Sequence, residues 1–183
     1  MTIRPAPTIL IAAVGAAALA LAAVSRPSRA SMTAMEKSLD KRIQTYSLDE
    51  PLVLLGHTRG LYLEGYGAIF SAEVNLIPVP ASPFIVTRTP QQIAKVRERK
   101  LRRVPEVKAL MKDVLADFGA SLDGVPPEER IVLGLSLFHF SWEDTRELPA
   151  QIVMGARRKV LVDFKSGRLN AAALGQEIQI TEQ

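Results

Sequence analysis

Two histidines, His57 and His139, are the residues of this chain best suited to acid–base chemistry. We expect His57 to open a β-strand at 52–63 and His139 to end another strand at 130–140. If these strands are neighbours, both rings lie near one end of a sheet, where acidic side chains complete an acid–base or metal site. The acidic side chains close to them in the expected strands and loops are Glu64, Glu73, Glu143 and Asp144.

The spacing of these residues matches no known catalytic signature. The chain has no H-E-x-x-H metal motif, no G-x-S-x-G nucleophile elbow and no glycine-rich phosphate loop before a helix. We therefore predict no metal ion and no cofactor, and retain His57, His139, Glu64 and Glu143 as catalytic candidates. The alternative is that both histidines make hydrogen bonds within the core, which is the commoner role for histidines without a motif.

Composition indicates one ordinary globular domain. The chain has 183 residues, of which 48% are hydrophobic, and its formal net charge is +4. Residues 1–30 hold three arginines and no acid, so the remainder carries 20 basic and 19 acidic residues. A nearly neutral body gives no reason to expect nucleic acid as a partner. The absence of cysteine excludes disulfides, thiolate nucleophiles and cysteine-based zinc sites.

The first thirty residues have the layout of a secretory signal peptide. An apolar run from Thr8 to Val24 follows a short segment with one arginine, and Ser28 and Ala30 occupy positions −3 and −1 of a cut after Ala30. We expect residues 31–183 to form a single domain that is periplasmic or secreted. The alternative is an uncleaved membrane anchor, for which the apolar run is somewhat short.

Strict alternation predicts a half-buried strand at 68–76, because side chains in a strand point to opposite faces with a period of two. The β-rich run at 52–63 precedes it, and Glu64–Gly67 lies between the two. Two glycines in that short stretch supply positive φ values without steric cost, so the whole of 52–76 is expected to form a β-hairpin.

The remaining elements follow from apolar spacing and from turn residues. We expect a helix at 31–48, a helix that begins at Thr89–Pro90 and is kinked or divided at Pro105, and a central buried strand at 130–140. Residues 151–155 form a short strand followed by a helix to Lys165, or the whole stretch forms one helix from Pro149. A short helix at 170–175 and an edge strand at 178–181 complete the chain.

This order of elements indicates an α+β domain. Strands and helices do not alternate regularly, which favours an antiparallel or mixed sheet. The sheet is expected to be built on the hairpin at about 52–76, with the strand at 130–140 in its centre and the helices packed on one side.

Two stretches are candidate binding surfaces. Around the hairpin turn, tyrosines and charged groups can line a shallow recognition groove, since tyrosine is favoured at interfaces. Its candidates are Arg59, Tyr62, Glu64 and Tyr66. The alternative is that Tyr62 packs in the core and the glycines merely turn the chain.

The second stretch is the basic run at 95–103, in which six of nine residues are lysine or arginine. Such a run can bind an anionic membrane surface. The candidate residues are Lys95, Arg99, Arg102 and Arg103. The alternative is a solvated helix face.

The stretch GLYLEGYGAIFSAEVNLIP resembles a stretch in exported bacterial proteins of uncharacterised function, which share the pattern G-x-Y-L-x-G-Y-G-x-x-F-x-x-E-V. It covers about a tenth of the chain. The resemblance implies a location in the bacterial envelope and brings no activity and no site residues.

Together these observations favour a non-catalytic exported protein that binds an unidentified protein or envelope component through the hairpin and adjacent loops. The alternatives are a periplasmic hydrolase or metal-dependent enzyme that uses His57 and His139, and a peripheral membrane binder that uses the basic run.

Overall fold

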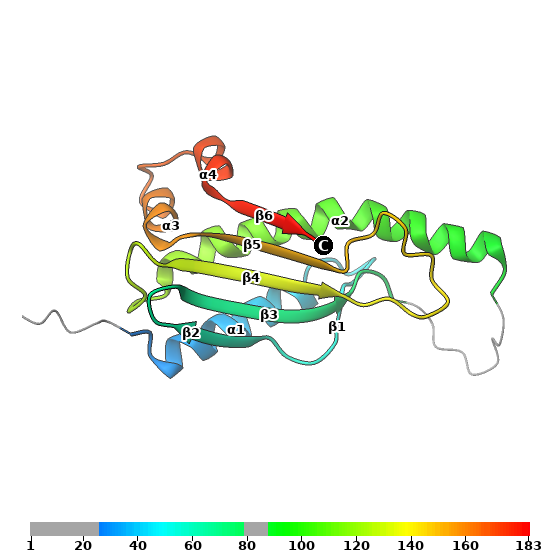
Figure 1. Cartoon of the computed structure of the whole chain (residues 1–183), viewed down its shortest axis with the longest axis horizontal. Coiled ribbons are helices and arrows are strands. Elements are labelled where there is room, and N and C mark those ends of the chain that lie inside the picture. Colours follow the sequence, from blue (N-terminus) through cyan, green and yellow to red (C-terminus); the bar gives the residue numbers. More distant parts are fainter. Residues whose placement is uncertain (1–25, 79–87) are drawn as a thin grey trace, which may run out of the picture.

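A computed structural model describes residues 26–78 and 88–183. Within these residues six strands form one mixed sheet (Figure 1). They are β1 (Val53–Leu54), β2 (Arg59–Leu63), β3 (Gly67–Asn75), β4 (Arg130–Leu137), β5 (Gln151–Arg157) and β6 (Gln179–Glu182). The order is β1-β3-β4-β5-β6, and β2 pairs with β3 on the same edge as β1. Among these described strands, only the β3–β4 pair is parallel. The predicted α+β class and the mixed sheet are confirmed.

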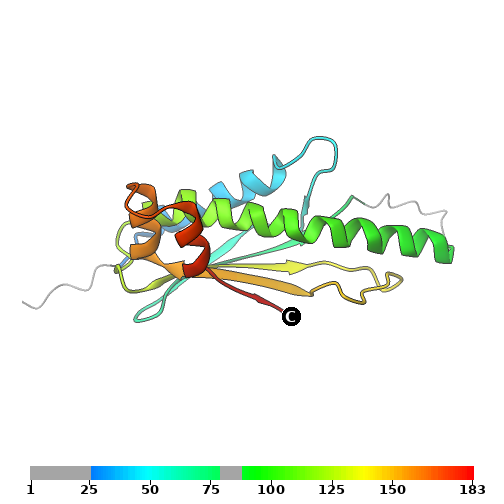
Figure 2. The same cartoon turned by 90° about the horizontal axis from the view of Figure 1, so that it is seen from above.

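Four α-helices accompany the sheet in the described part of the chain. They are α1 (Arg29–Gln44), α2 (Pro90–Phe118), α3 (Arg158–Lys165) and α4 (Ala171–Glu177). Both α1 and α2 cover one face of the sheet, and α3 and α4 continue this layer at one end, so no described helix lies against the opposite face (Figure 2). The prediction that the helices pack on one side is confirmed.

The core lies between this helical layer and the covered face of the sheet. From α1, the apolar stripe Met32, Met35, Leu39 and Ile43 is buried, as the three-to-four spacing predicts. From β3, the alternate residues Ala68, Phe70, Ala72 and Val74 are buried against the helices. Full burial of one large apolar side chain such as Leu39 or Phe70 contributes about 1.5–3 kcal/mol, so this interface stabilises the packing of the helices on the sheet.

The predicted strand at 52–63 is interrupted in the structure. Gly56 has a φ of +97° and turns the chain between β1 and β2, so His57 lies in a loop and does not open a strand. The hairpin itself is confirmed as β2 and β3, joined by a turn in which Gly65 has a φ of +80°.

The central strand is also confirmed, although it ends at Leu137, so His139 follows it in a loop. Residues 151–157 form β5, so the alternative of one helix from Pro149 is wrong. At the start of α2, the Thr89 side chain caps the helix as predicted and forms a capping box with Gln92.

The structure has one continuous α2, and Pro105 lies inside it. Of the two alternatives in the sequence, the division into two helices is therefore wrong. Proline lacks the N–H for one helical hydrogen bond. Burial of Val104 and Val107 beside it holds the helix against the sheet.

Candidate functional site

The structure places the two histidines in separate surroundings. Strand β3 lies between β2 and β4, so the strands near His57 and His139 are not neighbours. His57 contacts Asp40, whereas His139 contacts Glu143. Among residues 26–78 and 88–183, no group of three or more histidine or acidic side chains is arranged to hold a metal ion. The two rings therefore do not meet in one site.

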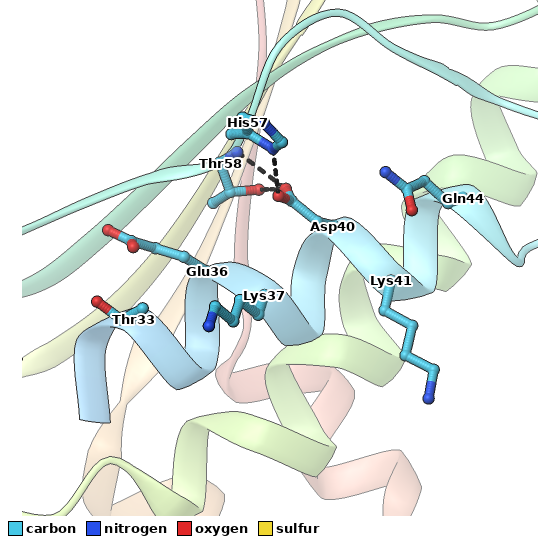
Figure 3. Close-up of a pocket in the computed structure, with 8 residues that line it drawn as sticks. All are labelled: Thr33, Glu36, Lys37, Asp40, Lys41, Gln44, His57 and Thr58. Atoms are coloured by element: carbon cyan, nitrogen blue, oxygen red, sulfur yellow. Dashed lines mark hydrogen bonds and ion pairs between the residues drawn. The ribbon is translucent and has the colours of Figure 1, made fainter. Parts of the chain in front are cut away.

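In the first of these sites, the carboxylate of Asp40 orients the imidazole of His57 (Figure 3). Asp40 of α1 accepts hydrogen bonds from the backbone N–H and the side-chain hydroxyl of Thr58, at 2.8 and 2.5 Å. His57 Nδ1 lies 3.2 Å from the other oxygen of the same carboxylate. One turn earlier, Glu36 accepts the backbone N–H of Gly60 at 2.9 Å. These two carboxylates hold the outer edge of β2 against α1.

Hydrogen bonding keeps Asp40 ionised. Burial raises the pKa of Asp40, but hydrogen bonds from Thr58 and His57 outweigh burial and hold this pKa below its ordinary value. The His57 side chain is 83% exposed and borders an open cavity of about 470 Å³. Its ring is thus fixed on one side and accessible on the other, which is suited to proton transfer. Lys41 also borders this cavity but points away from His57 (Figure 3).

Asp40→Asn tests the role of this carboxylate. We expect it to lower the free energy of unfolding at pH 7 by about 1–3 kcal/mol, because hydrogen bonds to a charged group are lost. The folded pKa of Asp40 is depressed, so its contribution is present above the ordinary value of 3.8 and is lost as pH falls through the lower folded value. Urea unfolding at pH 7 and at about pH 2.5 measures this. An equal difference between wild type and variant at both pH values would contradict it.

The second site is a buried charged cluster beneath the β4–β5 loop. The side chains of Lys100 and Glu143 are 0% and 1% exposed, and Lys100 Nζ lies 2.5 Å from Glu143 Oε2. Lys100 also donates to the carbonyl of Phe138 at 2.8 Å, and its Nζ lies 3.3 Å from His139 Nδ1. His139 Nε2 lies 3.3 Å from the carbonyl of Pro149.

These contacts assign His139 an internal role. Its Nε2–H donates to the Pro149 carbonyl and its Nδ1 accepts from the Lys100 ammonium, so both ring nitrogens are occupied. Burial lowers the pKa of Lys100, and Glu143 opposes this effect only in part. The cluster joins α2 to the β4–β5 loop, and its Lys100–Glu143 pair is closed to solvent.

The remaining acidic candidate in this loop, Asp144, also makes structural contacts. It accepts hydrogen bonds from the side chain and the backbone of Arg146, which lower the pKa of Asp144 to about 2. It therefore remains ionised and bound to arginine throughout the physiological range.

The four hairpin candidates do not share one groove. Arg59 lies on the open face of the sheet, whereas Tyr62 packs toward the core. Burial, together with the nearby negative charges of Glu129 and Glu64, raises the pKa of Tyr62. Glu64 Oε2 lies 2.5 Å from Arg26 Nη2, and Tyr66 is 46% exposed at the turn.

Most of the basic run at 95–103 binds carboxylates within the domain. Five of its six cations form ion pairs: Arg97 with Glu147 and Asp144, Arg99 with Glu50, Lys100 with Glu143, Arg102 with Glu98, and Arg103 with Glu106. Lys95 is the member without such a pair among the described residues. This neutralisation weakens the electrostatic attraction that a membrane binder would need from this run.

Sequence reasoning missed Asp40 and Lys100, the two residues that organise these sites. Both lie among other charged residues on helices, and their partners are distant in the chain. The four-residue spacing of Glu36 and Asp40, which places both on one helix face, was the available signal.

Comparison with known protein families, with curated proteins and with solved structures finds no match for this chain. In the described residues, no helix has the length and apolar character to cross a bilayer.

Proposed function

We propose that this protein is an exported, non-catalytic envelope protein that binds a partner through the open face of its sheet beside the β2–β3 hairpin. The observation that carries the proposal is the one-sided helical layer, which leaves that face of the sheet without a helix in the described chain (Figure 2). The apolar leader, the signal-peptide layout and the resemblance to exported bacterial proteins support a periplasmic or secreted location.

Apolar side chains of the hairpin support a protein partner. Leu61 and Leu63 are 50% and 48% exposed on β2, and Leu61 pairs with Ile69 of β3. Arg59, two positions before Leu61, lies on the same face and can donate several hydrogen bonds. Apolar anchors beside an arginine are typical of the energetic centre of protein interfaces.

Gly134 leaves the centre of this face without a side chain, and the residue itself is buried. It lies in the middle of β4 between Ser71 and Val153 of the neighbouring strands. Its φ is not positive, and a Cβ at this position would meet nothing closer than 3.9 Å. Glycine inside a strand costs about 0.5–1 kcal/mol relative to alanine, so the fold does not explain this residue. A partner backbone that approaches this position closely would account for it.

Gly134→Ala separates folding from binding. We expect the variant to be as stable as wild type or more stable by about 0.5–1 kcal/mol, because the backbone loses less entropy on folding. We also expect weaker partner binding, because the added methyl group occupies the contact surface. Thermal unfolding and partner cross-linking measure the two effects. A variant with reduced stability and unchanged cross-linking would contradict this role of Gly134.

Photo-cross-linking tests the proposed surface. A photoreactive side chain at Leu61 is expected to give a specific adduct in intact cells, whereas one at the exposed Ala172 of α4 is not. A photoreactive side chain at Ile69 should also give an adduct. The substitution Leu61→Asp in that same chain should abolish it. Equal adducts from Leu61 and Ala172 would count against the open face as the binding surface.

A second candidate function is hydrolysis, which the Asp40–His57 pair favours. The imidazole is oriented by a carboxylate and is accessible from the cavity, as a general base must be. Chromogenic carboxylic and phosphoric esters test this candidate. Turnover by the wild-type protein that His57→Gln abolishes would support hydrolysis, and turnover that is unchanged by His57→Gln would exclude His57 as the base.

A further inference from the structure

Polar side chains on the open face of the sheet gather where β2, β3 and β4 lie side by side. The pairing register places Arg59 of β2 opposite Ser71 of β3, and Glu73 of β3 opposite Ser136 of β4. All four residues are exposed, and they border an open hollow of about 430 Å³. The hollow therefore has a guanidinium group and a carboxylate on its walls, with two hydroxyl groups beside them.

The register also fixes the order of chemical groups along this face. Leu61 opposite Ile69 forms an apolar row. The next row along β3 is Arg59 opposite Ser71, and the row after that contains Glu73. Neighbouring rows are about 7 Å apart, because a strand rises about 3.4 Å per residue. The face thus presents an apolar group, a cation and an anion in that order over about 14 Å.

Both charges are available to a partner. Neither Arg59 nor Glu73 forms an ion pair with another residue of the described ranges 26–78 and 88–183. Ser71 and Ser136 are small, and their hydroxyl groups can donate or accept hydrogen bonds beside either charge. Charges of opposite sign that face each other across an interface fix its register and exclude other partners.

We infer that this face recognises an extended protein segment whose alternate side chains are apolar, acidic and basic, lying over Leu61, Arg59 and Glu73 in that order. The inference rests on the proposed function and names the chemistry of its partner. Alternate side chains of an extended segment point to one side and lie about 7 Å apart, which matches the spacing of the rows. Gly134, beside Ser71 in β4, has no side chain to block the backbone of such a segment.

The open shape of the hollow favours a protein segment over a small molecule. Sites for small molecules are concave and bury about 70–90% of the ligand surface. This hollow lies on the face of a sheet that no described helix covers (Figure 2). A partner protein can supply the surface that encloses the charges on the other side.

Charge reversal tests the order of the groups in chains that carry a photoreactive side chain at Ile69 in intact cells. Arg59→Glu and Glu73→Arg should each lower the yield of the adduct about tenfold or more, because like charges then face each other. The double variant keeps the net charge and opposite charges on the face, so it should unfold at the wild-type temperature. It should still lose the adduct, because the order of the charges is exchanged. Lys95→Glu reverses an exposed cation on α2 and, as the matched control, should keep the adduct.

Each outcome of this experiment is decisive. An adduct that persists in the double variant overturns the inference and leaves the proposed surface intact. Loss of the adduct in Lys95→Glu as well overturns it too, because net charge and not the order of charges would then control binding. Absence of any adduct in the wild-type chain overturns the proposed function, and the inference with it.

Synthetic peptides test the same order of groups without altering the protein. One peptide carries leucine, glutamate and lysine at alternate positions with threonine between them, and its control has glutamate and lysine exchanged. Titration of the purified chain, followed by NMR, should show binding of the first peptide about tenfold tighter than that of the control. Equal affinity of the two peptides, or binding of neither, would overturn the inference.

Discussion

Lys100→Met is expected to lower the free energy of unfolding by about 3–5 kcal/mol, because it leaves Glu143 buried without its cation. The Glu143 side chain is 1% exposed, and its Oε1 has no hydrogen-bond partner among the described residues. Lys100 also donates to the Phe138 carbonyl, which loses this donor in the variant. Equilibrium unfolding in urea at pH 7 measures the loss.

Two further variants test whether the loss of stability comes from the unpaired buried charge. Lys95→Met removes a lysine from the same helix without breaking an ion pair of the described residues, and its effect should stay within about 0.5 kcal/mol. The double variant Lys100→Met/Glu143→Leu should recover much of the stability lost in Lys100→Met, because it removes both buried charges. A loss below about 1 kcal/mol in the single variant would show that the pair is not a structural anchor.

Gly67→Ala is expected to cost about 3–5 kcal/mol, the sum of backbone strain and a steric clash. Gly67 begins β3 with a φ of +133°, and an added Cβ would lie 1.9 Å from the carbonyl oxygen of Arg130. The clashing atom belongs to the backbone of β4, so a side-chain rotation cannot relieve the contact. The parallel β3–β4 pair, which begins at these two residues, would have to separate.

Gly65→Ala is the matched control for this substitution. Gly65 lies two residues earlier with a φ of +80°, and an added Cβ there would meet no atom within 4 Å. Its cost is therefore conformational strain alone, about 1–2 kcal/mol. Thermal unfolding of both variants measures the difference. Equal losses would mean that close packing of Gly67 on Arg130 is not required.

The local pattern of apolar and polar residues was sufficient to predict the elements whose burial alternates or is continuous along the chain. Alternation identified β3, and an unbroken apolar run identified β4 as the central strand. Thr89 before Pro90 located the start of α2, since both residues have fixed roles at a helix N-terminus. The fold class followed from the order of these elements.

Contacts between residues that are far apart in the chain could not be predicted from the sequence. Nothing near Lys100 indicates that Glu143 neutralises it, because that pairing depends on how α2 lies over the β4–β5 loop. The attachment of Thr58 to Asp40 likewise depends on the packing of α1 against the β2 edge. The sequence allowed the two histidines to be either functional or internal. Their partners in the structure, Asp40 for His57 and Glu143 for His139, distinguish them.

Cysteine protection in cells tests the central claim, that the open sheet face binds a partner in the envelope. The cysteine-free chain allows single substitutions at Ser71 and Ser136 on that face and at Ser166 after α3 as a control, and all three serines are exposed. A membrane-impermeant maleimide should label all three variants when purified. In cells whose outer envelope alone has been permeabilised, we expect Ser71→Cys and Ser136→Cys to be protected and Ser166→Cys to be labelled. Equal labelling of the three in cells would contradict it.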